Sequence, residues 1–202
     1  MLEQVVVDEA VRELRPDFAV LVMTAEGLAN GPGDAESEGW LAEAAATADA
    51  EDPHVEAWRE AYRAFGAKPQ RTRPSVDALL RRADALPIGG EDLDAYQGPA
   101  RLVRASGDEP FDVIAGGEPA VEHPNAGEVV WGDDAGVTCR RWNWRQCVRT
   151  RLTEDTKNGL FLLESLAPYP MERLTEAGDR LAELLRAISP DVRIGSRLLG
   201  GR

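Results

Sequence analysis

One acidic residue, Glu164, stands directly after the apolar run Leu160–Leu163. A short apolar run of this length is typical of a buried strand. A carboxylate drawn into such surroundings is destabilising unless hydrogen-bond donors meet it, so a partly buried Glu164 indicates a binding role. The alternative is a side chain at the end of a strand that turns to solvent.

Two tryptophans flank an asparagine in the segment Trp142-Asn143-Trp144. Residues two apart in a strand point the same way, so we expect Trp142 and Trp144 on one face and Asn143 on the other. The two indoles could stack on a base or on an amino-acid side chain, at about 1–3 kcal/mol each. The alternative is a core pair of tryptophans with Asn143 exposed.

Two further segments have small or polar residues at a spacing that suits a ligand. Gly89-Gly90-Glu91-Asp92 is expected to form a tight turn whose glycines allow the backbone to approach a ligand closely. The alternative is a simple loop with acidic surface residues. Thr156 and Asn158 precede the apolar run, where they either satisfy backbone groups or touch a ribose.

The chain lacks the residue patterns that several kinds of chemistry require. Cys139 and Cys147 form no CxxC pair, and His54 and His123 stand outside any HExxH arrangement, so we expect neither a metal nor a cofactor. The two cysteines are expected to be packed small residues, with a nucleophilic thiolate as the alternative. The chain also contains no GxSxG nucleophile elbow and no Walker A motif.

The charges are distributed unevenly along the chain. The net charge is −13, which opposes non-specific binding to a polyanion. The basic residues are concentrated in residues 59–82 and 139–151. If these stretches meet, they form a positive groove suited to a phosphate backbone, and otherwise they pair with the surplus carboxylates. The candidate RNA-binding residues are Arg71, Arg73, Arg81, Arg82, Arg140, Arg141 and Arg145.

The elements that position these residues follow from periodicity and turn signals. Helices are expected over 38–50, 53–65 and a short stretch from Ser75, and a last amphipathic helix is expected to end at Ser189-Pro190. Strands are expected at Asp17–Met23, Ala100–Ala105, Pro110–Ile114, Glu128–Trp131, Gly136–Trp144 and Leu160–Leu163, with a hairpin connection at 132–136.

Helices and strands are segregated rather than alternating, which predicts the α+β class with a mostly antiparallel sheet flanked by helices. We expect one domain over 1–202, with a helix-rich part at 1–86, a strand-rich part at 87–168 and a C-terminal helix at 170–189. No run of about 18 apolar residues exists, and the first residues are acidic, so a membrane partner is not expected and a cytoplasmic location is.

Four strings, in this order, resemble a known domain. They are AWREAYRAFGAKPQRTRPSVDALLRR, LPIGGEDLD, GEVVWGDDAGVTCRRWNWRQ and LTEDTKNGLFLLESL. Over about Asp17 to Leu185 the chain resembles the B3/B4 domain, which occurs in the phenylalanyl-tRNA synthetase β subunit and in free-standing proteins. The strings IGGED and CRRWNWR are closest to the free-standing branch.

This resemblance implies a pocket for an aminoacyl-adenosine end, and in the synthetase the domain hydrolyses tyrosine wrongly attached to the phenylalanine tRNA. The synthetase glutamate that reads the tyrosine hydroxyl falls on Glu164. A synthetase pocket histidine falls at Gly89-Gly90 and is missing here. A glycine-rich synthetase segment is replaced by residues 141–145, and the stretch 82–88 before IGGED is shorter than in relatives.

Three functions remain open at this point. The first is metal-free hydrolysis of a mischarged aminoacyl-tRNA at its 3′ end, with Asn143 and the backbone N–H groups of Gly89 and Gly90 polarising the ester carbonyl. In this function Glu164, Trp142, Trp144, Glu91, Asp92, Thr156 and Asn158 bind the substrate. The second is a non-catalytic module that binds an aromatic amino acid or a small metabolite. The third is an arginine patch that docks an acidic protein.

Overall fold

The computed structural model describes residues 2–46, 49, 51–81 and 91–201. Its three longest strands and one two-residue strand form a four-stranded sheet in the order β11-β2-β10-β3. These strands span Arg193–Gly200, Ala19–Glu26, Asn158–Ser165 and Glu91–Asp92, respectively. All the neighbours in this sheet are antiparallel. Strand β10 lies between β2 and β3, so the expected central strand at Leu160–Leu163 is confirmed.

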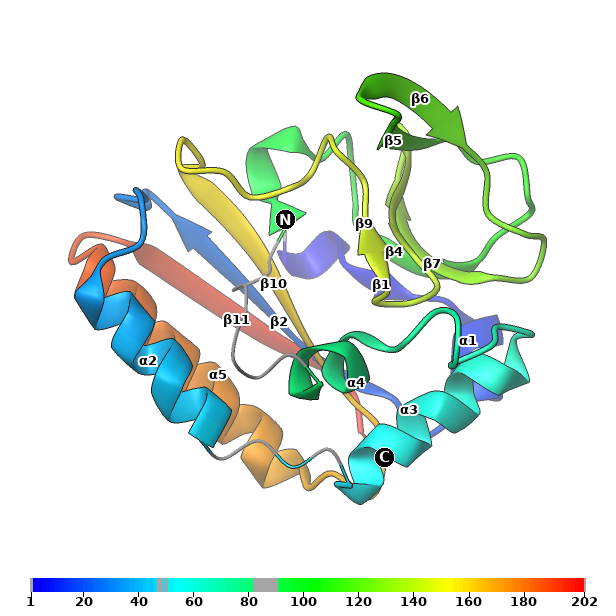
Figure 1. The fold of residues 1–202 in the computed structure, drawn as a ribbon, viewed down its shortest axis with the longest axis horizontal. Helices are drawn as coiled ribbons and strands as arrows, with labels where there is room; N and C mark the ends of the chain where they lie inside the picture. Colours follow the sequence, from blue (N-terminus) through cyan, green and yellow to red (C-terminus); the bar gives the residue numbers. More distant parts are fainter. Residues whose placement is uncertain (1, 47–48, 50, 82–90, 202) are drawn as a thin grey trace.

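Strand β2 supplies side chains to two hydrophobic cores because its residues alternate between the two faces of the sheet. Leu21 and Met23 pack in one core with Leu174 and Leu185 of helix α5, Met171–Ile188. Val20 and Val22 belong to the other core. In Figure 1 helix α2, Ala35–Ala46, lies beside α5 on the first of these faces.

The second core fills the space between this sheet, the helices near residue 60 and a second sheet. That sheet has the order β1-β4-β7-β8-β9, and a separate hairpin, β5-β6, follows β4 in the chain. The strands of this part of the chain are β1, Val6–Val7; β4, Arg101–Arg104; β5, Phe111–Ala115; β6, Glu118–Glu122; β7, Val129–Asp133; β8, Gly136–Arg140; and β9, Arg145–Gln146.

Helix α3, Pro53–Ala64, carries the apolar face that its sequence predicts. The Asp52 side chain caps its first turn by accepting a hydrogen bond from the His54 N–H at 2.7 Å. Trp58 and Tyr62 are fully buried on its inner face. Gly66 follows the helix with φ +86°, the left-handed conformation that glycine adopts readily. The remaining helices are α1, Glu9–Leu14; α4, Ser75–Leu80; and the 3-10 turns η1, Leu2–Gln4, and η3, Leu93–Ala95.

The α+β class with mostly antiparallel sheets is confirmed, and two expectations about strands are corrected. Strand β8 ends at Arg140 and not at Trp144. Strand β11 was not expected at all, although it pairs with β2 over the whole length of that strand. Residues 47, 48 and 50 of the expected helix 38–50 lie outside the described residues. Within the described part of the chain, no helix is long and apolar enough to cross a membrane.

Candidate functional site

A cavity of about 400 Å³ lies between β10, β7, helix α4 and the turn after β8. Two glutamates and three tryptophans are among its lining residues, and we call it the carboxylate cavity. Its walls comprise Ser75, Ala78, Leu79, Glu91, Trp131, Cys139, Trp142, Asn143, Trp144, Arg145, Gln146, Leu160, Leu162 and Glu164. The cavity therefore gathers side chains from four separate parts of the sequence.

Glu164 reaches the carboxylate cavity because strand alternation places it on the same face of β10 as Leu160 and Leu162. Its Oε1 accepts a hydrogen bond from Trp131 Nε1 at 2.8 Å, and its Oε2 accepts one from Asn143 Nδ2 at 2.9 Å. Burial raises the pKa of Glu164 to about 7, and these two donors oppose the rise. The side chain thus faces a cavity rather than open solvent.

The turn that follows β8 has a backbone conformation that the sequence did not predict. Arg141 and Trp142 have φ values of +48° and +68°, which are uncommon for residues that carry a side chain. Such residues destabilise a chain by roughly 1–3 kcal/mol each and tend to cluster at functional sites. Because residues 141–144 form a turn, the expectation that Trp142 and Trp144 share one face of a strand is wrong.

The two tryptophans of this turn occupy different surroundings. Trp142 is fully buried, with ring centroids 5.1 Å from Phe18 and 5.4 Å from Trp58. Trp144 is partly buried, and the Arg141 guanidinium lies 4.4 Å from its ring centroid. Both indoles nevertheless line the carboxylate cavity. Trp142 is therefore both a core residue and a residue of the cavity wall.

Asn143 is the residue that connects this turn to the rest of the site. Its Oδ1 accepts hydrogen bonds from the Tyr62 hydroxyl at 2.9 Å and from the Ser75 N–H at 3.1 Å. Its Nδ2 donates to Glu164. An exposed Asn143 is thus excluded. Helix α3, helix α4 and strand β10 are joined through this one amide, which fixes the direction of the Glu164 carboxylate.

Glu91 supplies a second carboxylate to the cavity, and its side chain is almost fully buried at 4% exposure. The Tyr96 hydroxyl donates to its Oε2. Burial raises the pKa of Glu91 to about 7, while the Tyr96 hydrogen bond opposes that rise. The charge of Glu91 also raises the pKa of Glu164. The two carboxylates therefore interact electrostatically, and each has a pKa near neutral pH.

Three other residues that were predicted to bind the substrate, Asp92, Thr156 and Asn158, lie away from the carboxylate cavity. The Thr156 hydroxyl donates to Asp92 at 3.1 Å, and Asn158 Nδ2 donates to Asp94 at 2.6 Å. None of Asp92, Thr156 and Asn158 is among the residues that line the carboxylate cavity. They hold the loop before β10 against η3, which is the structural alternative. Gly89, Gly90 and Arg82 lie outside the described residues.

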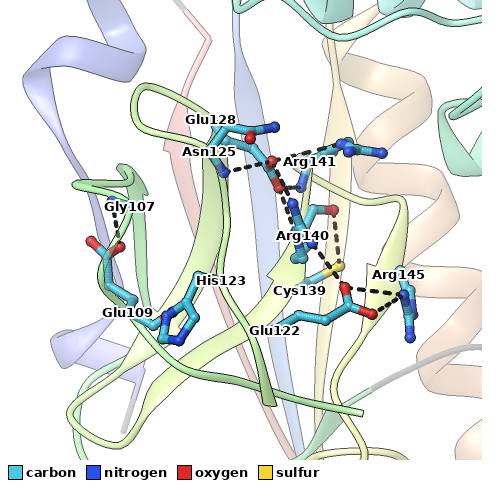
Figure 2. A network of polar contacts seen from close by, with 10 residues as sticks. All are labelled: Gly107, Glu109, Glu122, His123, Asn125, Glu128, Cys139, Arg140, Arg141 and Arg145. Atoms are coloured by element: carbon cyan, nitrogen blue, oxygen red, sulfur yellow. Dashed lines mark hydrogen bonds and ion pairs between the residues drawn. The ribbon is translucent and has the colours of Figure 1, made fainter. Parts of the chain in front are cut away.

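The arginine candidates separate into paired and more exposed groups. Arg140 is buried and forks onto Glu128 through Nε and Nη2, both at 2.9 Å, while its Nη1 donates to Glu122 at 3.0 Å (Figure 2). Arg145 also donates to Glu122, at 3.3 Å. A guanidinium held in this way is structural, so Arg140 is poorly placed for an RNA contact.

The remaining arginines lie near helices α3 and α4. Arg73 and Arg81 approach the buried Asp77 at 3.9 and 2.9 Å, so part of their charge is neutralised. Arg71 lines a second cavity of about 450 Å³ together with Lys68 and Arg141. The buried Glu128 also lines this cavity and pairs with Arg141 at 3.6 Å. Both expected stretches of basic residues thus contribute to this second cavity, which we call the basic cavity.

Several residues of the site carry no signal in the sequence. Trp131 and Tyr96 are aromatic residues of strand-rich segments, and Tyr62 is on the apolar face of α3. Their roles as donors to Glu164, Glu91 and Asn143 depend on contacts between distant segments. In the described part of the chain, no group of three or more His, Cys, Asp or Glu side chains is placed to hold a metal ion.

Comparison with known proteins defines the class of this α+β domain. The family model described as "B3/4 domain" matches residues 83–189, more than half of the chain. The chain therefore belongs to the B3/4 domain family. Its structure is similar to an N-terminal fragment of the phenylalanyl-tRNA synthetase beta-subunit from Pyrococcus horikoshii, with 17% identity and a TM-score of 0.49. That match covers 94% of this chain and 49% of the fragment, so this chain spans about half of its length. No curated protein matches.

Proposed function

We propose that this protein binds the aminoacyl end of a mischarged tRNA in the carboxylate cavity and hydrolyses its ester bond. One observation carries the proposal. Glu164 is held by Trp131 and Asn143 at the wall of a cavity that is otherwise lined by indoles and leucines. Membership of the B3/4 family is in line with a tRNA-associated role.

Glu164 suits the recognition of a polar group on an aromatic amino acid. An ionised carboxylate has about four lone-pair positions, and two protein donors leave room for a ligand hydroxyl. An apolar side chain in the same place would leave the carboxylate without that donor. A site built to hydrogen-bond a hydroxyl rejects the analogue that lacks it far better than a purely apolar pocket does. We therefore expect preference for tyrosine over phenylalanine.

Hydrolysis of an aminoacyl ester requires few catalytic groups, because the ester is already activated. It requires a positioned water and a donor for the ester carbonyl. One Nδ2 hydrogen of Asn143 is directed at Glu164, so its second hydrogen is the candidate carbonyl donor. Glu91, the other carboxylate of the cavity, has a pKa of about 7 and can accept the proton of the attacking water near neutral pH.

The basic cavity is the proposed place for the phosphates of the tRNA end. Arg141 lines the basic cavity, and the next residue, Trp142, lines the carboxylate cavity. The turn 141–144 thus stands between the two cavities. Lys68 and Arg71, which line the basic cavity as well, are exposed and can bind phosphate oxygens.

The direct test is deacylation of a panel of mischarged tRNAs. We expect release of tyrosine from tRNA, and loss of most of that activity in Glu164→Ala. Glu164→Gln keeps the shape and one acceptor oxygen, so it should lose less activity than Glu164→Ala. The exposed Glu118→Gln serves as a matched control and should behave as the unaltered protein. The proposal fails if the purified protein neither hydrolyses nor binds any charged tRNA in the panel.

A second candidate is a non-catalytic module that binds a free aromatic amino acid or a small metabolite. It is favoured by the engagement of the Asn143 side chain, whose oxygen is occupied by Tyr62 and Ser75. In this case Glu164→Ala abolishes binding of the small ligand, and bulk tRNA does not compete. Binding to tRNA that weakens steeply with salt supports the first candidate instead, because phosphate contacts release counterions.

A further inference from the structure

The second carboxylate of the cavity has a geometry that recognition of a hydroxyl by Glu164 does not explain. Glu91 is held rigidly because β3 pairs with β10 at Leu160 and the Glu91 backbone also bridges to Arg151. Its side chain is then directed into the cavity wall at 4% exposure. Rigid burial of a carboxylate at this position requires a compensating interaction.

Only one oxygen of Glu91 has that compensation. Oε2 accepts from the Tyr96 hydroxyl, whereas Oε1 has no partner at hydrogen-bond distance among the described residues. The nearby Thr138 hydroxyl lowers the pKa of Glu91 but is itself without a partner at that distance. A buried carboxylate oxygen without a donor is destabilising, and a native structure that retains one has a reason for it, such as a catalytic role or a bound water or ion. The free Oε1 therefore indicates a missing donor in the cavity.

The charged groups around Glu91 do not supply that donor. Arg149 forks onto Asp133 at 2.8 and 2.9 Å, and the cavity-lining Arg145 donates to Glu122. Asp133, on β7, and Glu164, on β10, are themselves acidic. Two buried carboxylates thus line one cavity, while the two nearby arginines are engaged by other acids.

We propose that Glu91 forms a binding site for a primary ammonium group, such as the α-amino group of an amino acid or of an aminoacyl ester. An ammonium offers three donors and a positive charge, which match the free Oε1 and the negative charge of Glu91. The indoles of Trp131, Trp142 and Trp144 line the same cavity and attract cations to their faces. This inference rests on the proposed function only in sharing its cavity.

The inference is tested by calorimetric titration with tyramine and with N-acetyltyramine, which keeps the phenol but lacks the charge. Tyramine remains cationic near neutral pH, as a lysine amine does. We expect tyramine to bind at least about tenfold more tightly than N-acetyltyramine. In Glu91→Gln that advantage should disappear, while the affinity for N-acetyltyramine stays the same. Glu118→Gln is the control and should keep the full difference.

Equal affinity for the two ligands in the unaltered protein overturns the inference without any variant, and so does a Glu91→Gln protein that folds and keeps the preference. Thermal unfolding of each variant checks that it is folded. A free amino acid and an aminoacyl ester are separated by comparing L-tyrosine with L-tyrosine methyl ester. If only the ester competes with tyramine, the natural ligand is an aminoacyl ester.

Failure of the inference and failure of the proposed function give different results. If Tyr-tRNA and N-acetyl-Tyr-tRNA are deacylated at equal rates, the ammonium site is contradicted and the hydrolase function is supported. If tyramine is preferred but mischarged tRNAs are not hydrolysed, the ammonium site is supported and the hydrolase function is contradicted.

Discussion

At the scale of single residues, the site depends on two carboxylates whose surroundings disfavour their charge. Burial raises the pKa values of Glu91 and Glu164 from 4.5 to about 7. The folded protein therefore retains protons that the unfolded chain releases between about pH 4.5 and 7. Their contribution to stability is greatest below pH 4.5 and is lost as the pH rises through 7. His54, whose pKa burial lowers, produces a slope of the opposite sign near its ordinary value of 6.5.

Glu91→Gln isolates this effect because His54 is unchanged in the variant. We expect similar free energies of unfolding for the two proteins near pH 5. At pH 8 the variant should be more stable by on the order of 3 kcal/mol, since it has neither the buried charge nor its repulsion of Glu164. Urea unfolding at the two pH values measures the difference. If the two proteins differ by the same free energy of unfolding at both pH values, the raised pKa of Glu91 is contradicted.

At the scale of elements, the turn 141–144 is positioned by the hairpin of β7 and β8. Gly136 begins β8 with φ +140°, and a Cβ there would lie 2.4 Å from the Pro110 backbone oxygen. Gly116, in the β5-β6 hairpin, has φ +61° but no atom within 4 Å of its Cβ position. The two glycines thus share a left-handed backbone and differ in the space around them.

We expect Gly136→Ala to lower the free energy of unfolding by more than ~2 kcal/mol, because both the backbone conformation and the clash oppose a side chain. Gly116→Ala, which changes only the backbone preference, should lower it by ~1–2 kcal/mol or less. Urea titration of both variants gives the comparison. If both variants lose the same free energy of unfolding, the Pro110 segment moves away from the new side chain without destabilising the fold.

At the scale of the whole molecule, each sheet depends on distant parts of the chain. The four-stranded sheet combines β2, β10 and β11, and one core cluster holds residues from Val5 to Leu166. We therefore propose that residues 1–202 form one domain. Unfolding should follow a single transition, with tryptophan fluorescence and far-ultraviolet circular dichroism giving the same midpoint. Two separated midpoints would divide the chain into independent units.

The overall charge of −13 limits any tRNA contact to a local patch. The exposed Lys68 and Arg71 of the basic cavity predict a slope of about −1.4 for the logarithm of the association constant against that of salt concentration. Arg141 is not counted because it pairs with Glu128 at 3.6 Å. Arg71→Ala should reduce the slope by about 0.7. Arg180→Ala is a matched control, because Arg180 is an exposed arginine of α5 that pairs with Glu183. If the salt dependence is unchanged in Arg71→Ala, the tRNA phosphates do not bind at the basic cavity.

The sequence by itself determined the class of the fold, helix α3, strand β10 and the position of Glu164, because periodicity and capping are local properties. It also predicted that Glu91, Trp142, Asn143 and Glu164 belong to one site. Only the tertiary structure decided that residues 141–144 turn, that Asn143 joins three elements and that Glu91 lines the cavity while Asp92 does not. It also separated the paired Arg140 from the exposed Arg71. Strand β11 was missed because its residues are half exposed and gain their pairing only from β2. Long-range contacts of this kind leave no local pattern, since each partner is chosen by the folded chain.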